Sequence, residues 1–303
     1  MPNENPGMRE LMLRAWNAGT AIPSFNVPYL PMMEPIVRAL RDTRCFALIS
    51  VARLEWMKFE ARGVREIFDE YQRVKDERFT RLHLDHVPVI DEDQLPVDYL
   101  AKIGEAVDLG YASVMVDGSR LSLDENIAAT RAVVELAHRR DVPVEAELGA
   151  VLGHESGPMP PYEELFTTGK GFTDPAEARR FVEESGVDWL SVAVGSVHGS
   201  ISIDKRNEKK VVARLSIERL DALRAAANVP LVLHGGSGIR KEYIQESFKH
   251  GIAKINVGTA VRQPYEKGLA VSLEKARQAA YDTTVEIVRN ELALDGSVDS
   301  INP

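Results

Sequence analysis

Three histidines stand at the ends of separate apolar segments in this chain of 303 residues. They are His86 in LHLDH, His198 in GSVHG and His234 in PLVLHGG. They lie too far apart in the sequence to form a local zinc-finger knuckle, but three strand ends can bring them to one point. Three protein ligands with an open position for water or substrate are typical of a catalytic metal site. A single histidine at a strand end is more often half-buried with one hydrogen bond, so the hypothesis depends on the repetition.

An acidic residue, Asp85, immediately precedes His86 and strengthens this interpretation. The other histidines lack such a setting. His138 and His250 are expected near helix ends, where a positive charge suits the helix dipole. His83 is expected to fill space within its strand, and the role of His154 stays open.

Short apolar runs alternate with longer amphipathic segments along the chain, which is the pattern of repeated βα units. Strands are expected at residues 21–27, 45–51, 81–86, 111–118, 142–149, 189–195, 229–236 and 252–259. Helical patterns lie between them, among others at residues 33–43, 123–140, 174–186 and 216–229. We therefore expect an α/β fold, a (β/α)8 TIM barrel. It forms a single domain over residues 1–303, with a C-terminal helical extension, and its active site lies at the carboxyl ends of the strands.

Polar residues stand at the carboxyl end of every expected strand. In chain order they are Asn26, Ser50, Asp85 with His86, Asp117 with Ser119, Glu147, His198, His234, and Asn256 with Thr259. A purely structural barrel does not require such chemistry at one rim. The repetition therefore favours an enzyme.

Composition restricts the partners. The net charge of -9 argues against a surface for nucleic acid, although backbone N–H groups can still bind an anionic substrate in a local pocket. No run approaches the roughly 18 apolar residues of a membrane helix, and no signal peptide is expected. The single cysteine, Cys45, excludes an intrachain disulfide and fits a reducing compartment. We expect a cytoplasmic protein that binds a small molecule, with no nucleic-acid or membrane partner.

Taken in order, several segments resemble the class II, metal-dependent ketose-bisphosphate aldolases, the family of the fructose-bisphosphate and tagatose-bisphosphate aldolases. They are FNV (25–27), LHLDH (82–86), SVMVDGS (113–119), VEAELG (144–149), GSVHG (195–199), PLVLHGGSG (230–238) and AKINVGT (253–259). The resemblance extends over nearly the whole chain. It implies a lyase that cleaves or forms a carbon–carbon bond of a ketose phosphate, with dihydroxyacetone phosphate and an aldehyde as products, through a zinc-stabilised enediolate.

The resemblance also implies a metal site. His86, His198 and His234 match the zinc ligands of the family. Glu147 and Asp117 match acids that lie just outside the metal or serve an alternative metal position. Other divalent metals are alternatives to zinc, and a monovalent cation is a further candidate cofactor.

Two acids match the proton-transfer residues of the family. Asp85 matches the acid/base that takes the proton from the hydroxyl whose collapse to an aldehyde breaks the bond, although a carboxylate here can also simply orient His86. Glu155 matches a loop glutamate that moves a proton on or off the enediolate carbon. A glutamate in a loop can also merely be solvated.

The substrate site is expected at the last three strand ends, where barrels commonly bind phosphate through backbone N–H groups. Its residues are Gly199, Gly235, Gly236, Ser237, Gly258 and Thr259, although the glycines can also serve only to permit tight turns. By resemblance, Asn256 contacts the substrate, and Asn26 and Ser50 lie near its other end. A ketose phosphate is the expected small-molecule partner, and a homodimer or homotetramer is the expected assembly.

Residues 52–79, 150–170 and 200–213 depart from the family, so the sugar and its number of phosphates stay open. Arg53 either contacts an anionic group on the aldehyde half of the substrate or pairs with a nearby glutamate. An aldolase with another donor, or with an unphosphorylated sugar or sugar acid, is an alternative. A barrel metallohydrolase is a second, but the first strand carries SFNV instead of paired histidines. A non-catalytic sugar-phosphate binder is a third, although Asp85 and Glu155 are both present.

Overall fold

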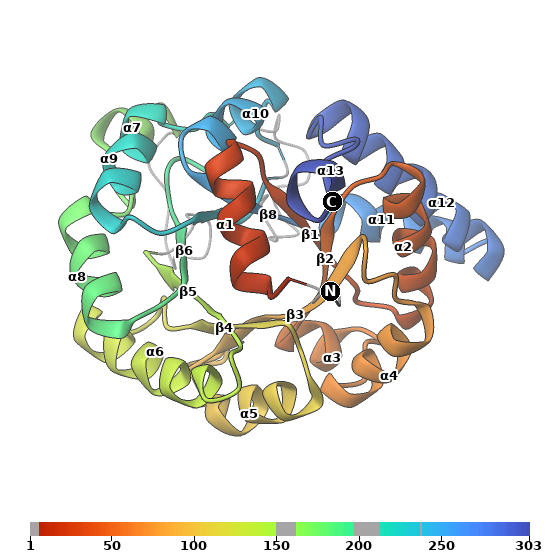
Figure 1. Cartoon of the computed structure of the whole chain (residues 1–303), viewed down its shortest axis with the longest axis horizontal. Helices are drawn as coiled ribbons and strands as arrows, with labels where there is room; N and C mark the ends of the chain where they lie inside the picture. Colours follow the sequence, from red (N-terminus) through yellow and green to blue (C-terminus); the bar gives the residue numbers. More distant parts are fainter. Residues whose placement is uncertain (1–5, 150–161, 197–212, 237) are drawn as a thin grey trace.

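Eight parallel strands form a closed barrel in sequence order (Figure 1). The computed structural model describes residues 6–149, 162–196, 213–236 and 238–303. The strands are β1 (Ile22–Asn26), β2 (Ala47–Ala52), β3 (Thr80–Pro88), β4 (Ser113–Asp117), β5 (Val144–Leu148), β6 (Trp189–Val192), β7 (Leu231–Leu233) and β8 (Ile252–Val257). Each pairs with the next, and β8 pairs with β1. Both faces of such strands are covered, so most of their residues are buried and many are apolar.

Helices surround this barrel (Figure 1). They are α1 (Met8–Ala18), α2 (Met33–Asp42), α3 (Arg53–Lys58), α4 (Val64–Val74), α5 (Tyr99–Leu109), α6 (Leu123–His138), α7 (Tyr162–Thr168), α8 (Pro175–Ser185), α9 (Ile217–Ala227), α10 (Lys241–Lys249), α11 (Thr259–Leu269), α12 (Leu273–Glu286) and α13 (Val298–Ile301). Two short helical turns, Leu30–Met32 and Ile287–Glu291, precede α2 and follow α12. None of the described helices is long and apolar enough to cross a membrane.

The expected barrel is confirmed, and the differences lie at the strand ends. Six strands fall inside their expected ranges, while β2 ends one residue later and β3 extends from Thr80 to Pro88. The strand β7 is only Leu231–Leu233, and His234, Gly235 and Gly236, which were expected within it, follow outside the ladder. Each of the four helices expected from its pattern is found within about two residues of its predicted ends.

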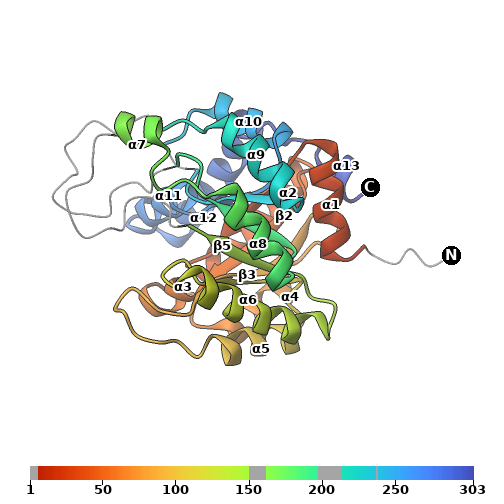
Figure 2. The same ribbon diagram turned by 90° about the vertical axis from the view of Figure 1, so that its left-hand side faces the viewer.

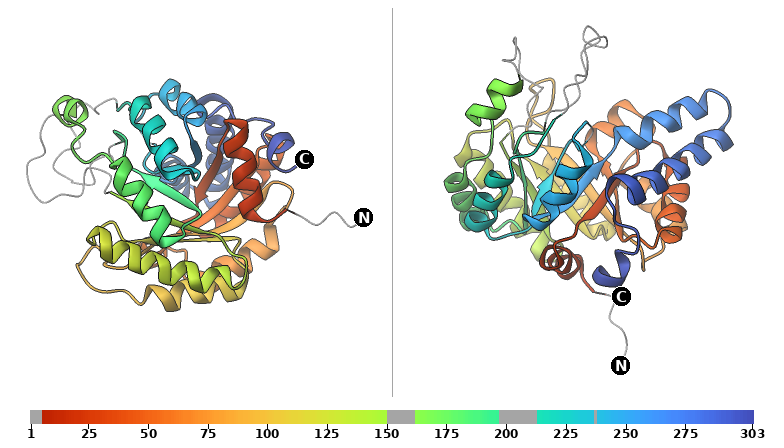
Figure 3. Two further views of the ribbon diagram at one scale, coloured as in Figure 1. Left: turned by 60° about the vertical axis from the view of Figure 1, so that its left-hand side comes forward. Right: turned by 90° about the horizontal axis from the view of Figure 1, so that it is seen from above.

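The two ends of the barrel differ. The helix α1 covers the amino-terminal ends of the strands, where Met8, Leu11 and Met12 pack with Phe46 and Trp189 in a small apolar core. Figure 2 shows α1 and α13 on this side and α7 on the opposite side. The opposite end of the barrel, with the carboxyl ends of the strands, is where the site is expected. The helices α11 and α12 pack along each other and extend outward (Figure 3).

Candidate active site

Polar residues occupy two successive levels inside the barrel. Alternate residues of a strand point to the same side, so pairs two positions apart both face the interior. The rim level contains Asn26, Asp85, Glu147 and Asn256, and the level below it contains Ser24, His83, Glu145 and Lys254. Their mutual contacts confirm that these pairs face inward. The first level was expected from the sequence, but the second was largely missed.

A bulge in β3 brings both Asp85 and His86 to the site. Consecutive strand residues normally point to opposite faces. Between Leu84 and Val87, however, β3 has one residue more than its partner β4, and His86 has a φ of 31°. This left-handed conformation is uncommon for a residue other than glycine and often marks functional sites. The bulge explains how adjacent residues can serve one centre.

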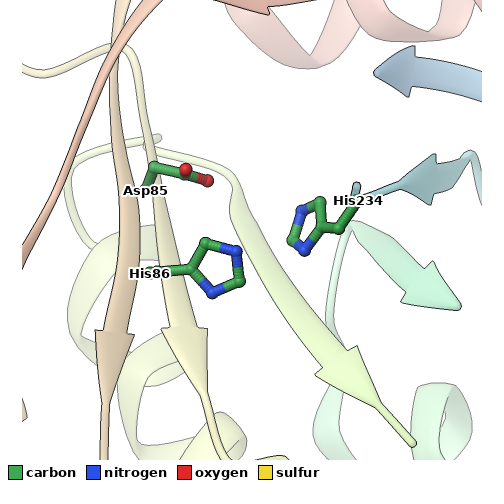
Figure 4. A group of neighbouring side chains, drawn as sticks. All are labelled: Asp85, His86 and His234. Atoms are coloured by element: carbon green, nitrogen blue, oxygen red, sulfur yellow. The ribbon is translucent and has the colours of Figure 1, made fainter. Parts of the chain in front are cut away.

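The rings of His86 and His234 lie next to each other at the rim, with centroids 4.5 Å apart and planes tilted by 56° (Figure 4). His86 comes from β3, and His234 directly follows β7. The Nδ1 atom of His86 lies 3.1 Å from Oδ2 of Asp117, and Nδ1 of His234 lies 3.0 Å from Oε2 of Glu147. One ligand atom from each of Asp85, His86 and His234 lies within 4.8 Å of the others. The structure therefore brings these expected residues together.

Asp85 is held by two asparagine side chains. Asn26 donates from Nδ2 to Oδ2 of Asp85 at 2.9 Å, and Asn256 donates to both carboxylate oxygens at 3.0 and 3.1 Å. Burial opposes ionisation, but the positive charges of His86 and Lys254 hold the pKa of Asp85 well below its usual range. Asp85 is therefore a fixed carboxylate with its oxygens directed at the centre of the rim.

Glu145 connects the lower level to the rim. Its carboxylate lies 2.9 Å from Nε2 of His234, accepts a hydrogen bond from Trp189 at 2.8 Å, and pairs with Lys254 at 2.9 Å. Burial opposes its charge, but Lys254 and His234 lower the pKa of Glu145 to about 2. Lys254 also donates to Oδ1 of Asn256 at 2.7 Å. One buried network therefore supports His234 and, through Asn256, Asp85.

Known proteins share this arrangement of motifs and strands. A sequence model of the class II fructose-bisphosphate aldolases matches residues 7–298. The chain belongs to this family. It resembles the solved structure of the YdjI aldolase from Escherichia coli K12, with 26% identity over 97% of this chain and 99% of the other, and a TM-score of 0.73. The residues matched by the family model include Asp85 and His86 on β3 and His234 directly after β7.

Two further solved structures agree. A protein from Coccidioides immitis, described as a fructose-1,6-biphosphate aldolase, has 28% identity over 98% of this chain and 99% of the other, with a TM-score of 0.75. The fructose-bisphosphate aldolase from Campylobacter jejuni has 17% identity over 95% of both chains and a TM-score of 0.73. At that identity it supports the fold alone.

The site of this class II aldolase family member fits a divalent cation. Class II aldolases depend on a metal, and imidazole with carboxylate is a donor set that zinc accepts. Asp85, Glu145 and Glu147 are all buried, and within the described chain their charge is offset by Lys254 and by the rings of His86 and His234 when these are protonated. A cation held by the two neutral rings would take over this compensation. A second group with suitable spacing is His86, Asp117 and Glu147.

Four expected site residues, His198, Glu155, Gly199 and Ser237, lie outside the described residues. Ser50 is fully buried below the rim, where its hydroxyl bonds to that of Ser24. His83, expected to fill space in its strand, is fully buried, but its Nε2 also lies 3.6 Å from Oδ1 of Asp85. Arg53 pairs with Asp91 at 3.6 Å, instead of with a glutamate.

The expected phosphate residues lie where the chain leaves β7 and β8. Gly235, with a φ of 73°, and Gly236 directly follow His234, and Gly258 precedes the first residue of α11, Thr259. A side chain at Gly236 would approach Ile255 to 3.1 Å. A cavity of about 300 Å³ beside this segment is lined by Gly236, Gly238, Ile239, Lys241, Ile244, Ala260 and Glu291. Lys241 is a basic side chain that the sequence reasoning did not single out.

Proposed function

We propose that this protein is a divalent-metal-dependent aldolase, which cleaves a ketose phosphate into dihydroxyacetone phosphate and an aldehyde or catalyses the reverse condensation. The observation that carries the proposal is the Asp85 carboxylate, fixed by Asn26 and Asn256 beside the adjacent rings of His86 and His234. This arrangement suits proton transfer next to a cation. The family and the YdjI-like fold support the reaction class.

Zinc is the proposed metal, with His86, His198 and His234 as its ligands and Glu147 and Asp117 as neighbouring acids. When bound, the cation supplies a positive charge that stabilises the negative charge developing on the substrate oxygens during bond cleavage. Asp117 orients His86 through Nδ1, and Glu147 lies beside Nδ1 of His234, the nitrogen that would face the metal. The lower level, through Glu145, fixes the other nitrogen of His234.

Asp85 is the proposed acid/base. Its lowered pKa keeps it ionised at neutral pH, so an oxygen is available to accept the proton of the substrate hydroxyl. Asn26 and Asn256 hold both oxygens at fixed positions, so little reorganisation is needed when the proton moves. Glu155 is proposed, from the resemblance alone, to transfer the proton at the donor carbon.

The phosphate of the donor half is proposed to lie at the ends of β7 and β8. The backbone of Gly235, Gly236 and Gly258 is free of side chains there, and α11 begins at Thr259. The N–H groups of a helix start bind phosphate well. Gly199 and Ser237 complete the proposed set. Asn256 is proposed to contact the substrate from β8, and Asn26 to lie near its other end, whereas Ser50 is buried too deeply below the rim to reach it.

A homodimer or homotetramer is proposed for the assembly. Leu269, Val271 and Leu273 are exposed at the turn between α11 and α12, which extends from the barrel (Figure 3). Neighbouring apolar side chains in solvent favour a protein contact. Sedimentation of the purified protein would test this, and a monomer at micromolar concentration would exclude it.

The reaction is tested with purified protein and added zinc, cobalt or manganese, by assaying aldehyde release from a panel of ketose mono- and bisphosphates. We expect metal-dependent cleavage that a chelator abolishes. Asp85→Ala should lose at least about 100-fold in kcat while elemental analysis still finds bound metal. Asp93→Ala, at an exposed acid nearby, is the control. Full activity of the Asp85→Ala protein would exclude the acid/base role.

A further inference from the structure

A second carboxyl group, that of Glu55, lies beside Asp85 in the active site. Glu55 is in the first turn of α3, which begins directly after β2 at the carboxyl rim of the barrel. Its Oε2 accepts the N–H of Ala52 at 2.8 Å and lies 3.5 Å from Nδ2 of Asn26. The same Asn26 nitrogen donates to Asp85. The two carboxyl groups therefore flank one amide nitrogen.

Glu55 has no compensating cation of its own. No ion pair with lysine or arginine involves it within the described chain, and the neighbouring Arg53 pairs with Asp91 instead. Desolvation of the partly exposed Glu55 side chain above all, and also the charge of Asp85, raises the pKa of Glu55 to about 8 against the hydrogen bonds from Ala52 and Asn26 and the charge of His86. The neutral carboxylic acid is therefore favoured near pH 7 in the metal-free protein. Because Oε2 accepts the N–H of Ala52, Oε1 is the oxygen available to carry a proton.

We propose that Glu55 is a specificity-determining residue, which donates a hydrogen bond to a hydroxyl or carbonyl oxygen of the aldehyde half of the substrate and excludes a phosphate there. The inference depends on the proposed aldolase function, because Asp85 then acts at the carbon that becomes the aldehyde. Glu55 shares Asn26 with Asp85 and so lies on that half of the substrate.

Among the described residues, the charges of this part of the site support an uncharged aldehyde. A phosphate is bound in proteins by arginine, lysine or several N–H donors. Here a phosphate would lie beside the Asp85 carboxylate and the carboxyl group of Glu55. That group offers a single proton when it is neutral and repels the phosphate when it is ionised. The substrate class is therefore a ketose phosphate with a single phosphate, on the donor half, and an unphosphorylated hydroxyaldehyde as the other product.

The test is the condensation of dihydroxyacetone phosphate with D-glyceraldehyde or with D-glyceraldehyde 3-phosphate, which differ only in the phosphate. For the wild-type protein with metal, we expect kcat/KM to be at least about tenfold higher for D-glyceraldehyde. Glu55→Lys should shift this ratio at least about tenfold toward the phosphorylated aldehyde. Glu60→Lys places the same charge change on an exposed residue near α3 and should leave the ratio unchanged.

A second pair of variants tests the same role if the Glu55→Lys protein fails to fold. Glu55→Gln retains a donor and should keep the wild-type preference, whereas Glu55→Ala should lose most of it. A wild-type preference for the phosphorylated aldehyde, or equal ratios for Glu55→Gln and Glu55→Ala, overturns the role of Glu55 and leaves the aldolase function intact. Failure to condense dihydroxyacetone phosphate with any aldehyde overturns the aldolase function, and the inference with it.

Discussion

The carboxylate of Glu145 lies 2.9 Å from Nε2 of His234, below the rim of the barrel and out of reach of solvent. A carboxylate in this position fixes the ring orientation and the tautomer of a metal-binding histidine. With Nε2 held by Glu145, the other nitrogen, Nδ1, is the one directed at the rim, where Glu147 lies. Lys254 and Trp189 keep the Glu145 carboxylate in place.

Glu145→Gln is expected to weaken metal binding by roughly 10- to 100-fold, because the hydrogen bond to His234 loses its charge. Competition with a chromophoric chelator measures the affinity. Trp189→Phe removes one bond to Glu145 but leaves the contact with His234, so its affinity should stay near that of the wild type. Glu145→Gln/Lys254→Met also removes the unpaired lysine; if this variant binds metal as the wild type does, Glu145 has no positioning role.

The sequence predicted the barrel and the rim because each depends on a local pattern. Apolar runs predict the strands, and the polar residue that ends each run predicts the rim. The lower level was missed because Glu145 and Lys254 lie within strands, where a single charged residue among apolar ones does not by itself indicate a functional site. An available signal was the spacing of two that places Glu145 before Glu147 and Lys254 before Asn256.

Other features depend on three-dimensional contacts that no local pattern encodes. The bulge at His86 is set by the pairing of β3 with β4, and LHLDH alone does not indicate it. Asp91 lies 38 residues along the chain from Arg53, so a nearby glutamate was the more natural partner to expect. The proximity of Glu55 to Asp85 likewise arises from β2 and β3 lying side by side.

Gly195 in the GSVHG motif is expected to tolerate no side chain. Its φ is 112°, and an added Cβ would lie 2.6 Å from the carbonyl oxygen of Arg214 and 2.9 Å from the ring of Phe166. Gly195→Ala should therefore lower the free energy of unfolding by roughly 2–4 kcal/mol. Gly104→Ala is the matched control. Gly104 lies within α5, where the new methyl group would only contact Leu136 at 3.7 Å, so a gain of about 0.5–1 kcal/mol is expected. Urea denaturation followed by circular dichroism measures both, and equal midpoints for the two variants would contradict the steric argument.

Glu55 is expected to make the stability of the metal-free protein depend on pH. Its pKa is about 8 in the folded protein against 4.5 in the unfolded chain, so the folded state binds more protons between these values. Stability therefore falls as pH rises through this window, and the loss is complete above about pH 8.

Glu55→Gln removes this dependence, because an amide does not titrate. In the presence of chelator, the variant should gain stability relative to the wild type as pH rises from 5 to 8. The gain is on the order of a few kcal/mol at most, since one pKa unit corresponds to about 1.4 kcal/mol. Urea denaturation at each pH measures the difference in unfolding free energy between variant and wild type. For the control Glu60→Gln, at an exposed glutamate, this difference should not change with pH. A Glu55→Gln difference that does not change with pH would mean that Glu55 is ionised in the folded protein, and the donor role proposed for it would then be wrong.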